Sequence, residues 1–340
     1  MIPFSLYNNS FLDTLYLKNN LLNGMIPNDL CGIATNLSFV SFDYNYFSGS
    51  ISNSLYTTCT QLAYLSVIDN ILIGNITNAF YDLTSLYQVA FSDNYITGTL
   101  SSSLSQLTGL IVVRLEYNYF SGSIPINSFS LFHDLQSLFI QGNSFTGDIT
   151  QSLFVNNTLL HITHIDISDN VFSGTIPIQI FQLDSLITFA ATKNCFNGEI
   201  SNVICNYVSS SNIEVLVLDG LTSADKCVIK SIISVIPFIT PVLVKYLSGT
   251  IPSCIYNIPY IKTLHLSGNG LGGSVVNSLP NTSQLSDLAV SYNQLSGTLP
   301  IAIQQWPFRV LDLSYNQIRG DLDYMSGSSS SSSTANTNSN

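Results

Sequence analysis

The sequence predicts a solenoid of the α/β repeat class, in which short turns of chain stack on one another and share one hydrophobic core. Segments of the pattern LxxLxLxxN recur along the 340 residues, and most follow one another at spacings of 23 to 27 residues, as in LDTLYLKNN ending at Asn20 and LSFVSFDYN ending at Asn45. A glycine lies four residues after the asparagine position in nearly every row, and a large apolar residue lies between the two. A turn of this length cannot bury its apolar residues alone, so the turns have to stack.

Each row begins with a short predicted strand that ends before an asparagine. In LxxLxL the last two apolar residues alternate, so both point to one side of a strand and the residues that flank them point to the other. The asparagine follows where the chain turns, and its buried side chain can satisfy loop N–H and C=O groups that would otherwise lack partners. We therefore predict a ladder of buried asparagines along the solenoid: Asn20, Asn45, Asn70, Asn94, Asn118, Asn143, Asn170, Asn194, Asn269, Asn293 and Asn316.

The second half of each row is a predicted turn. Gly24 is followed by Ile26 and Pro27, and the same order recurs in later rows. Glycine permits a tight backbone turn, and proline fixes φ where no N–H is needed. The large apolar residue before the glycine is expected to fill the corner between the strand side and the opposite side of the turn.

These residues resemble the leucine-rich repeat family, in its plant-type class with the consensus LxxLxLxxNxLxGxIPxxLxxLxx. The resemblance covers about residues 1–322. It implies a curved leucine-rich-repeat solenoid with a parallel β-sheet on the concave face and short helical, 3₁₀ or irregular segments on the convex face. It also implies similarity to the ectodomains of receptor-like proteins.

The domain organisation follows from the rows. We expect residues 1–325 to form one solenoid of about 13 rows, degenerate at 207–247, where Leu221 and Lys245 stand in place of the asparagine. Residues 326–340 are rich in serine and asparagine, and we expect a disordered tail because they contain almost nothing to bury. Both ends interrupt a repeat, so we expect the chain to be a fragment of a longer protein.

Composition excludes several classes of function. The formal net charge is -11 and no basic run occurs, so a phosphate backbone would be repelled and nucleic acid is not an expected partner. No apolar stretch reaches the roughly 20 residues that a helical membrane span needs. The sequence contains no recognisable catalytic constellation or metal-ligand cluster, and we predict neither an enzyme nor a cofactor.

The cysteines leave two interpretations open. Cys205 and Cys227 lie at similar phase on successive predicted turns, so a disulfide between them is geometrically possible, as is one between Cys227 and Cys254. Alternatively, the six cysteines are small buried apolar residues. Three glycosylation sequons fall on predicted connecting loops, at Asn36, Asn156 and Asn281.

The outward positions of the predicted strands are the candidate binding surface. Aromatic residues and arginine are enriched in binding hot spots, and repeat proteins use concave surfaces for partners. We expect Tyr16, Phe39 and Tyr64 to form an apolar stripe on three successive strands. The full set of candidate partner-binding residues is Tyr16, Phe39, Tyr64, Arg114, Glu116, Phe139, His164 and Asp166.

These observations favour a non-catalytic module that binds a protein, peptide or glycan through its concave face. The resemblance implies an extracellular or cell-surface location, as part of a secreted or receptor-like protein attached to the membrane through a segment outside this chain. Two alternatives stay open: a structural repeat protein of a cell surface or wall, and an intracellular scaffold in the cytoplasm.

Overall fold

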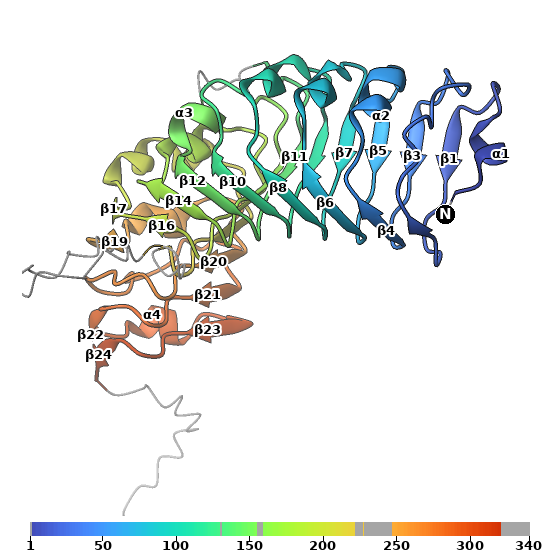
Figure 1. Cartoon of the computed structure of the whole chain (residues 1–340). Helices are drawn as coiled ribbons and strands as arrows, with labels where there is room; N and C mark the ends of the chain where they lie inside the picture. Colours follow the sequence, from blue (N-terminus) through green and yellow to red (C-terminus); the bar gives the residue numbers. More distant parts are fainter. Residues whose placement is uncertain (1, 130, 155–158, 222–226, 228–246, 321–340) are drawn as a thin grey trace, which may run out of the picture.

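The computed structural model confirms a curved solenoid of stacked turns and describes residues 2–129, 131–154, 159–221, 227 and 247–320. Figure 1 shows the turns side by side from the blue N-terminal end to the orange C-terminal end, along a course that bends in its second half. None of the helices in these residues has the length and apolar character that a membrane span requires. The expected tail at 326–340 lies outside the described residues.

The concave sheet contains twelve parallel strands within the described part of the chain, and each pairs with the strand of the next turn. Every strand contributes three residues, of which the middle one points into the core in most turns. The strands are β1 (Thr14–Tyr16), β3 (Phe39–Ser41), β5 (Tyr64–Ser66), β7 (Gln88–Ala90), β9 (Val112–Arg114), β11 (Ser137–Phe139), β13 (His164–Asp166), β15 (Thr188–Ala190), β18 (Val215–Val217), β20 (Thr263–His265), β21 (Asp287–Ala289) and β23 (Val310–Asp312).

A lateral sheet follows the ladder asparagines, and eight strands form it among the described residues. In chain order these are β2 (Asn23–Gly24), β4 (Tyr46–Gly49), β6 (Ile71–Asn75), β8 (Tyr95–Gly98), β10 (Tyr119–Ser123), β12 (Ser144–Asp148), β14 (Val171–Gly174) and β16 (Cys195–Phe196). Two further parallel pairs continue this side: β17 (Gly198–Glu199) with β19 (Leu247–Ser248), and β22 (Ser296–Thr298) with β24 (Gln317–Arg319).

Short helical segments form the convex side. Their brevity follows from the row length, because a turn leaves room for only one or two helical turns between its strands. The α-helices are α1 (Phe4–Tyr7), α2 (Asn53–Thr58), α3 (Thr150–Leu153) and α4 (Ile301–Gln304). The 3₁₀ helices are η1 (Asn78–Asp82), η2 (Ser102–Gln106), η4 (Ile178–Gln182), η5 (Asn202–Asn206), η6 (Val208–Ser210) and η7 (Ser253–Asn257).

The core is continuous from turn to turn, as the repeat requires. The predicted corner column is buried, and the rings of Phe120, Phe145 and Phe172 stack in register with centroids 6.0 and 6.1 Å apart. Each ring contributes about 2 to 3 kcal/mol through burial alone. Because each turn buries this column against its neighbours, the stability of one turn depends on the next.

The residue before each ladder position adopts a left-handed backbone conformation, a feature that the repeat pattern did not reveal. The position has positive φ even where it is not glycine, as at Tyr44 (54°), Asp93 (56°) and Lys193 (48°). A bulky residue in this region is uncommon. The conformation bends the chain at the end of the concave strand, so that the next residue, the asparagine, points inward.

One turn contains an insertion, and this corrects the expected row count. β18 pairs directly with β20, and the Leu218 amide donates to the His265 carbonyl at 2.8 Å. Residues 215–221 and Leu247 onward therefore belong to one turn, and 222–246 are inserted between them. The expected separate degenerate row ending at Lys245 has no strand in the concave sheet among the described residues, because β18 and β20 are direct neighbours there; Lys245 itself lies outside the described residues.

Candidate functional site

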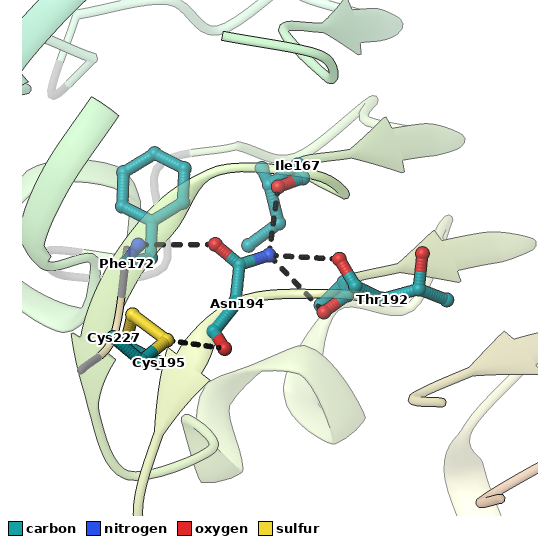
Figure 2. Close-up of a disulfide and its surroundings, with 7 residues drawn as sticks. Ile167, Phe172, Thr192, Asn194, Cys195 and Cys227 are labelled. Carbon is teal, nitrogen blue, oxygen red and sulfur yellow. Dashed lines mark hydrogen bonds between the residues drawn. A yellow bond between two sulfur atoms is a disulfide. The ribbon is translucent and has the colours of Figure 1, made fainter. Parts of the chain in front are cut away.

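The structure contains the predicted asparagine ladder from Asn45 to Asn316, whereas Asn20 is exposed and its side chain bonds only within its own turn. Asn194 Oδ1 accepts a hydrogen bond from the Phe172 amide of the preceding turn at 3.0 Å. Its Nδ2 donates to the carbonyls of Ile167, Ala191 and Thr192 at 3.0 to 3.2 Å, as Figure 2 shows in part. Asn45, Asn70, Asn94, Asn118, Asn143, Asn170 and Asn293 repeat this pattern. The ladder thus fixes the turns on which the concave residues are carried.

Asn269 shows how the ladder accommodates the insertion. Its Oδ1 accepts from the Leu221 amide at 2.8 Å, and its Nδ2 donates to the Leu218 carbonyl at 2.7 Å. A buried leucine at 221 replaces the asparagine of its own turn. The solenoid therefore continues across the insertion through the next asparagine.

The disulfides differ from the expected pairing of Cys205 with Cys227. Cys205 on η5 pairs with Cys254 on η7, and Cys227 pairs with Cys195. Counting 222–246 as part of regular rows placed Cys227 on a turn of its own between the other two. Because these residues are an insertion, η5 and η7 lie on adjacent turns, and Cys227 meets the residue after a ladder asparagine (Figure 2).

A third disulfide joins Cys31 and Cys59, so the interpretation of these residues as small buried apolar groups is also wrong. The six cysteines are all paired. Structural disulfides persist mainly in oxidising environments such as the extracellular space. The cysteines therefore favour an oxidising compartment, which the sequence alone left open.

An aromatic cluster covers the N-terminal part of the concave sheet. Phe39 and Tyr64 stack with ring centroids 6.5 Å apart, and Tyr87 contacts both at 6.3 Å. All three rings are half-buried, so each retains an open face. Tyr16 is 60% exposed, and its register partner is Ser41 rather than Phe39, so it lies beside this cluster and not in line with it. Tyr87 was missed because it lies one residue before the outward positions considered in the sequence.

A charged group lies on the next strands. Arg114 on β9 donates from Nε and Nη2 to Glu116 Oε1 at 2.9 and 2.6 Å, and its guanidinium lies 5.4 Å from the centroid of the Phe139 ring. The Arg114 side chain is 42% exposed, whereas that of Glu116 is 3% exposed. The sequence predicted both residues on this surface, but only the structure shows that the carboxylate is buried beneath it.

Three buried oxygens on three successive turns, one of them in this ion pair, have no hydrogen-bond partner among the described residues. They are Ser92 Oγ, Glu116 Oε2 and Gln141 Oε1. The Asp93 amide donates to the Glu116 carbonyl, and the Tyr117 amide to the Gln141 carbonyl, so the three residues occupy equivalent positions of adjacent turns. Adjacent parallel strands are about 4.8 Å apart. Leaving a buried charged acceptor without a donor is costly, which makes this group exceptional in the described residues.

The surroundings of these oxygens are acidic. Burial raises the pKa of Asp93, and the charges of Glu116 and Asp69 raise it further, against the opposing effect of Arg114. Burial also raises the pKa of Tyr117, together with carboxylates that include Asp93 and Glu116. Aspartates that directly precede ladder asparagines are the sequence signal for this acidic surface, but only the stacking of the turns brings them close together.

His164 and Asp166, which are both on β13, do not bond to one another. The His164 Nδ1 atom lies 2.8 Å from Thr163 Oγ1, and the Ser168 amide donates to Asp166 Oδ1 at 2.9 Å. Each has its own partner close by in the same turn, on either side of β13. The pair is therefore an ordinary polar part of the surface.

A second polar cluster, absent from the sequence-based candidates, lies near the C-terminal end of the concave sheet. His265 Nε2 is 3.0 Å from Asp287 Oδ1, and its Nδ1 is 3.6 Å from Asp219 Oδ2. Arg309 Nη2 donates to Asp287 Oδ2 at 2.7 Å. Burial raises the pKa of Asp219, although the Ser267 amide and His265 oppose this effect. These residues come from four successive turns, which is why no local motif marks them.

The sequons are accessible where the structure describes them. Asn36 and Asn281 are exposed and lie in turns. Asn156 lies outside the described residues. Glycosylation of these positions stays a prediction.

Comparisons with known proteins agree with the geometry. The Leucine Rich Repeat family model matches residues 11–33 and 260–282. Receptor-like protein 35 of Arabidopsis thaliana is 30% identical over 199 residues, covering 56% of this chain and 20% of that protein. The receptor protein-tyrosine kinase CEPR1 of the same plant is 41% identical over 80 residues, covering 22% of this chain and 8% of that protein. The chain thus matches at most a fifth of the length of these two relatives.

The structural comparison extends over nearly the whole chain. The plant peptide hormone receptor RGFR1, solved in complex with RGF2, has a TM-score of 0.73 and 27% sequence identity, covering 94% of this chain and 50% of that one. The repeat signature, the fold and these matches show a leucine-rich repeat solenoid. More particularly, it is of the plant type and resembles the ectodomains of receptors and receptor-like proteins.

Proposed function

We propose that the chain is a non-catalytic, peptide-binding module of a secreted or cell-surface receptor-like protein, and that its ligand lies across the concave sheet from β3 to β13. The aromatic cluster of Phe39, Tyr64 and Tyr87 carries this proposal. Three partly open rings, held by a rigid sheet, offer a large contact area at little cost in conformational entropy. The mixed apolar and charged surface that follows suits an extended peptide better than a flat protein interface.

The comparisons support a peptide as the ligand. The plant peptide hormone receptor RGFR1 was solved in complex with RGF2, and its sequence is 27% identical to this chain in a match that covers 94% of this chain. The three disulfides support the secreted or cell-surface location, because such bonds are rare in the cytosol. In an intracellular scaffold the same six cysteines would have to stay reduced, although they are placed for pairing.

The proposal is tested with a solid-phase array of defined synthetic peptides. Each is about ten residues long, which at ~3.3 Å per residue crosses about seven turns spaced by ~4.8 Å. The oxidised protein is applied as wild type and as the double variant Phe39→Ala/Tyr64→Ala. We expect peptides that bind the wild type to lose roughly tenfold or more in affinity for the variant.

A matched control removes two aromatic rings elsewhere. Tyr95 and Tyr119 stack on the lateral sheet with ring centroids 6.0 Å apart, and both are more exposed than Phe39 and Tyr64. Tyr95→Ala/Tyr119→Ala should leave peptide binding unchanged. Equal loss in both double variants, or no peptide binding together with self-association of the free protein, would argue for a structural repeat protein instead.

A further inference from the structure

We propose that the concave face contains a subsite for an arginine side chain of the peptide ligand, formed by Glu116 and flanked by Ser92 and Gln141. This inference rests on the proposed function and specifies which kind of peptide the surface selects. It is carried by the unpartnered buried oxygens of these three residues, by the charge around them and by the position of Arg114.

The hydrogen-bonding capacity of the subsite indicates a ligand group with several donors. Glu116 is 2% exposed and Ser92 is 0% exposed, yet Glu116 Oε2, Ser92 Oγ and Gln141 Oε1 have no hydrogen-bond partner in the described part of the chain. A carboxylate oxygen and an amide oxygen accept only, so the missing partner is a donor. A guanidinium presents five N–H donors in a planar fork and can bond several acceptors at once. An arginine side chain therefore matches the subsite better than a single ammonium or hydroxyl group.

The charge around the subsite is negative and favours a cationic ligand group. Four carboxylates raise the pKa of the Tyr117 hydroxyl, those of Asp93, Glu116, Asp166 and Asp169. Against these four negative charges stands the positive charge of Arg114, which is bonded to Glu116, so these five groups together carry a charge of -3 in the ionised state. Such a field attracts a cation and repels a carboxylate-bearing ligand group.

The Arg114 side chain controls access to the Glu116 carboxylate. Arg114 bonds only to Oε1 of Glu116 and is the exposed partner of the pair. It covers the carboxylate from the solvent side and partly neutralises it, so it stands in for the ligand cation in the free protein. Entry of a ligand arginine then requires the Arg114 side chain to move, and its removal should open the subsite and make the surface more negative.

The position of the subsite relative to the aromatic cluster sets the spacing in the ligand. Tyr64 lies on β5, and Glu116 lies two residues after the end of β9, which is two strands further along the sheet. Two spacings of ~4.8 Å amount to about 10 Å, or about three residues of an extended peptide. The preferred ligand should therefore carry an aromatic or aliphatic residue about three positions from its arginine.

The test uses the same peptide array, in which each peptide pairs phenylalanine with arginine, glutamine or glutamate at different spacings. Wild type should bind the arginine peptides roughly tenfold or more tightly than the glutamine peptides. Glu116→Gln should abolish this preference, and Asp93→Asn should weaken it. Asp93 is exposed with φ at 56°, a conformation that asparagine tolerates well, so the second variant preserves the fold. Asp82→Asn, which removes an exposed charge from convex η1, should change nothing.

Arg114→Ala gives the sharpest outcome. Our proposal expects this variant to bind arginine peptides more tightly than wild type does. Weaker binding of Arg114→Ala, together with a preference for glutamate peptides, would overturn the proposal and assign Arg114 to a ligand carboxylate. Binding that depends on Phe39 and Tyr64 but not on Glu116 or Asp93 would overturn the arginine subsite alone. Absence of binding that depends on the concave aromatics would overturn the proposed function itself.

Discussion

Replacing one interior ladder asparagine tests whether these side chains stabilise the solenoid, and Asn94→Ala is the most informative substitution. Asn94 is 5% exposed. Its Oδ1 accepts from the Leu72 amide at 3.0 Å, and its Nδ2 donates to the carbonyls of Val67, Phe91 and Ser92 at 2.8, 3.2 and 3.0 Å. The side chain thus makes four hydrogen bonds in a buried corner of two adjacent turns.

The cost of the substitution depends on which groups lose every partner. Each of the three carbonyls keeps another donor: Asn70 Nδ2 on Val67, Asn118 Nδ2 on Phe91 and the Asp69 amide on Ser92. The Leu72 amide loses its acceptor in a buried position. One orphaned buried donor costs about 1 to 3 kcal/mol, and loss of the other bonds adds about 1 kcal/mol. We therefore expect the free energy of unfolding to fall by about 2 to 4 kcal/mol.

Urea unfolding followed by circular dichroism measures this loss, and hydrogen exchange at the Leu72 amide locates it. Asn20→Ala is the matched control, because the Asn20 side chain is exposed and donates to the carbonyls of Leu17 and Lys18 in its own turn. The control should cost well under about 1 kcal/mol. An equal loss for both variants would refute the reasoning. The buried hydrogen bonds of the ladder would then contribute no more to stability than a change in helix or strand propensity does.

Three further predictions concern other parts of the solenoid. Cys205→Ser/Cys254→Ser opens a closed loop with a sequence separation of 49, and urea unfolding should show a loss of about 4 kcal/mol if the chain-entropy account holds. Gly74→Ala should cost about 1 to 3 kcal/mol, because φ is 91° and the added Cβ would lie 2.8 Å from a serine Cβ of the preceding turn, whereas Gly109→Ala should cost less than about 1 kcal/mol. Because burial raises the pKa of Asp219 above 3.8, the contribution of this residue to stability is greatest at low pH and is lost as pH rises through the raised value. Asp219→Asn should therefore gain stability relative to wild type over that range. Parallel profiles of unfolding free energy against pH for the two proteins would contradict this.

The repeat pattern predicted most of the scaffold because each of its signals is local. A ladder asparagine, a glycine four residues later and an apolar residue between them specify one turn, and stacking then follows from the need to bury that turn. The outward positions of Arg114, Phe39 and Tyr64 followed from strand alternation in the same way. Tyr87 was missed because it lies one residue before the outward strand positions, and its contact with these rings crosses adjacent turns.

The cysteine pairing and the row count could not be obtained from spacing. Residues 222–246 are about as long as a repeat, so counting along the chain treated them as one. Only the pairing of β18 with β20 shows that these two strands belong to adjacent turns, and this places Cys205 beside Cys254. An insertion of one repeat length is invisible to periodicity, because periodicity compares residues along the sequence and not across the sheet.

The sequence by itself determined that this chain is a solenoid, which residues face its core and which face outward, since these depend on patterns within a single turn. The tertiary structure alone decided the groups assembled from different turns: the aromatic cluster, the disulfides, and the buried oxygens of Ser92, Glu116 and Gln141. Their members lie more than 20 residues apart in sequence and meet because successive turns stack on one another, with adjacent parallel strands about 5 Å apart.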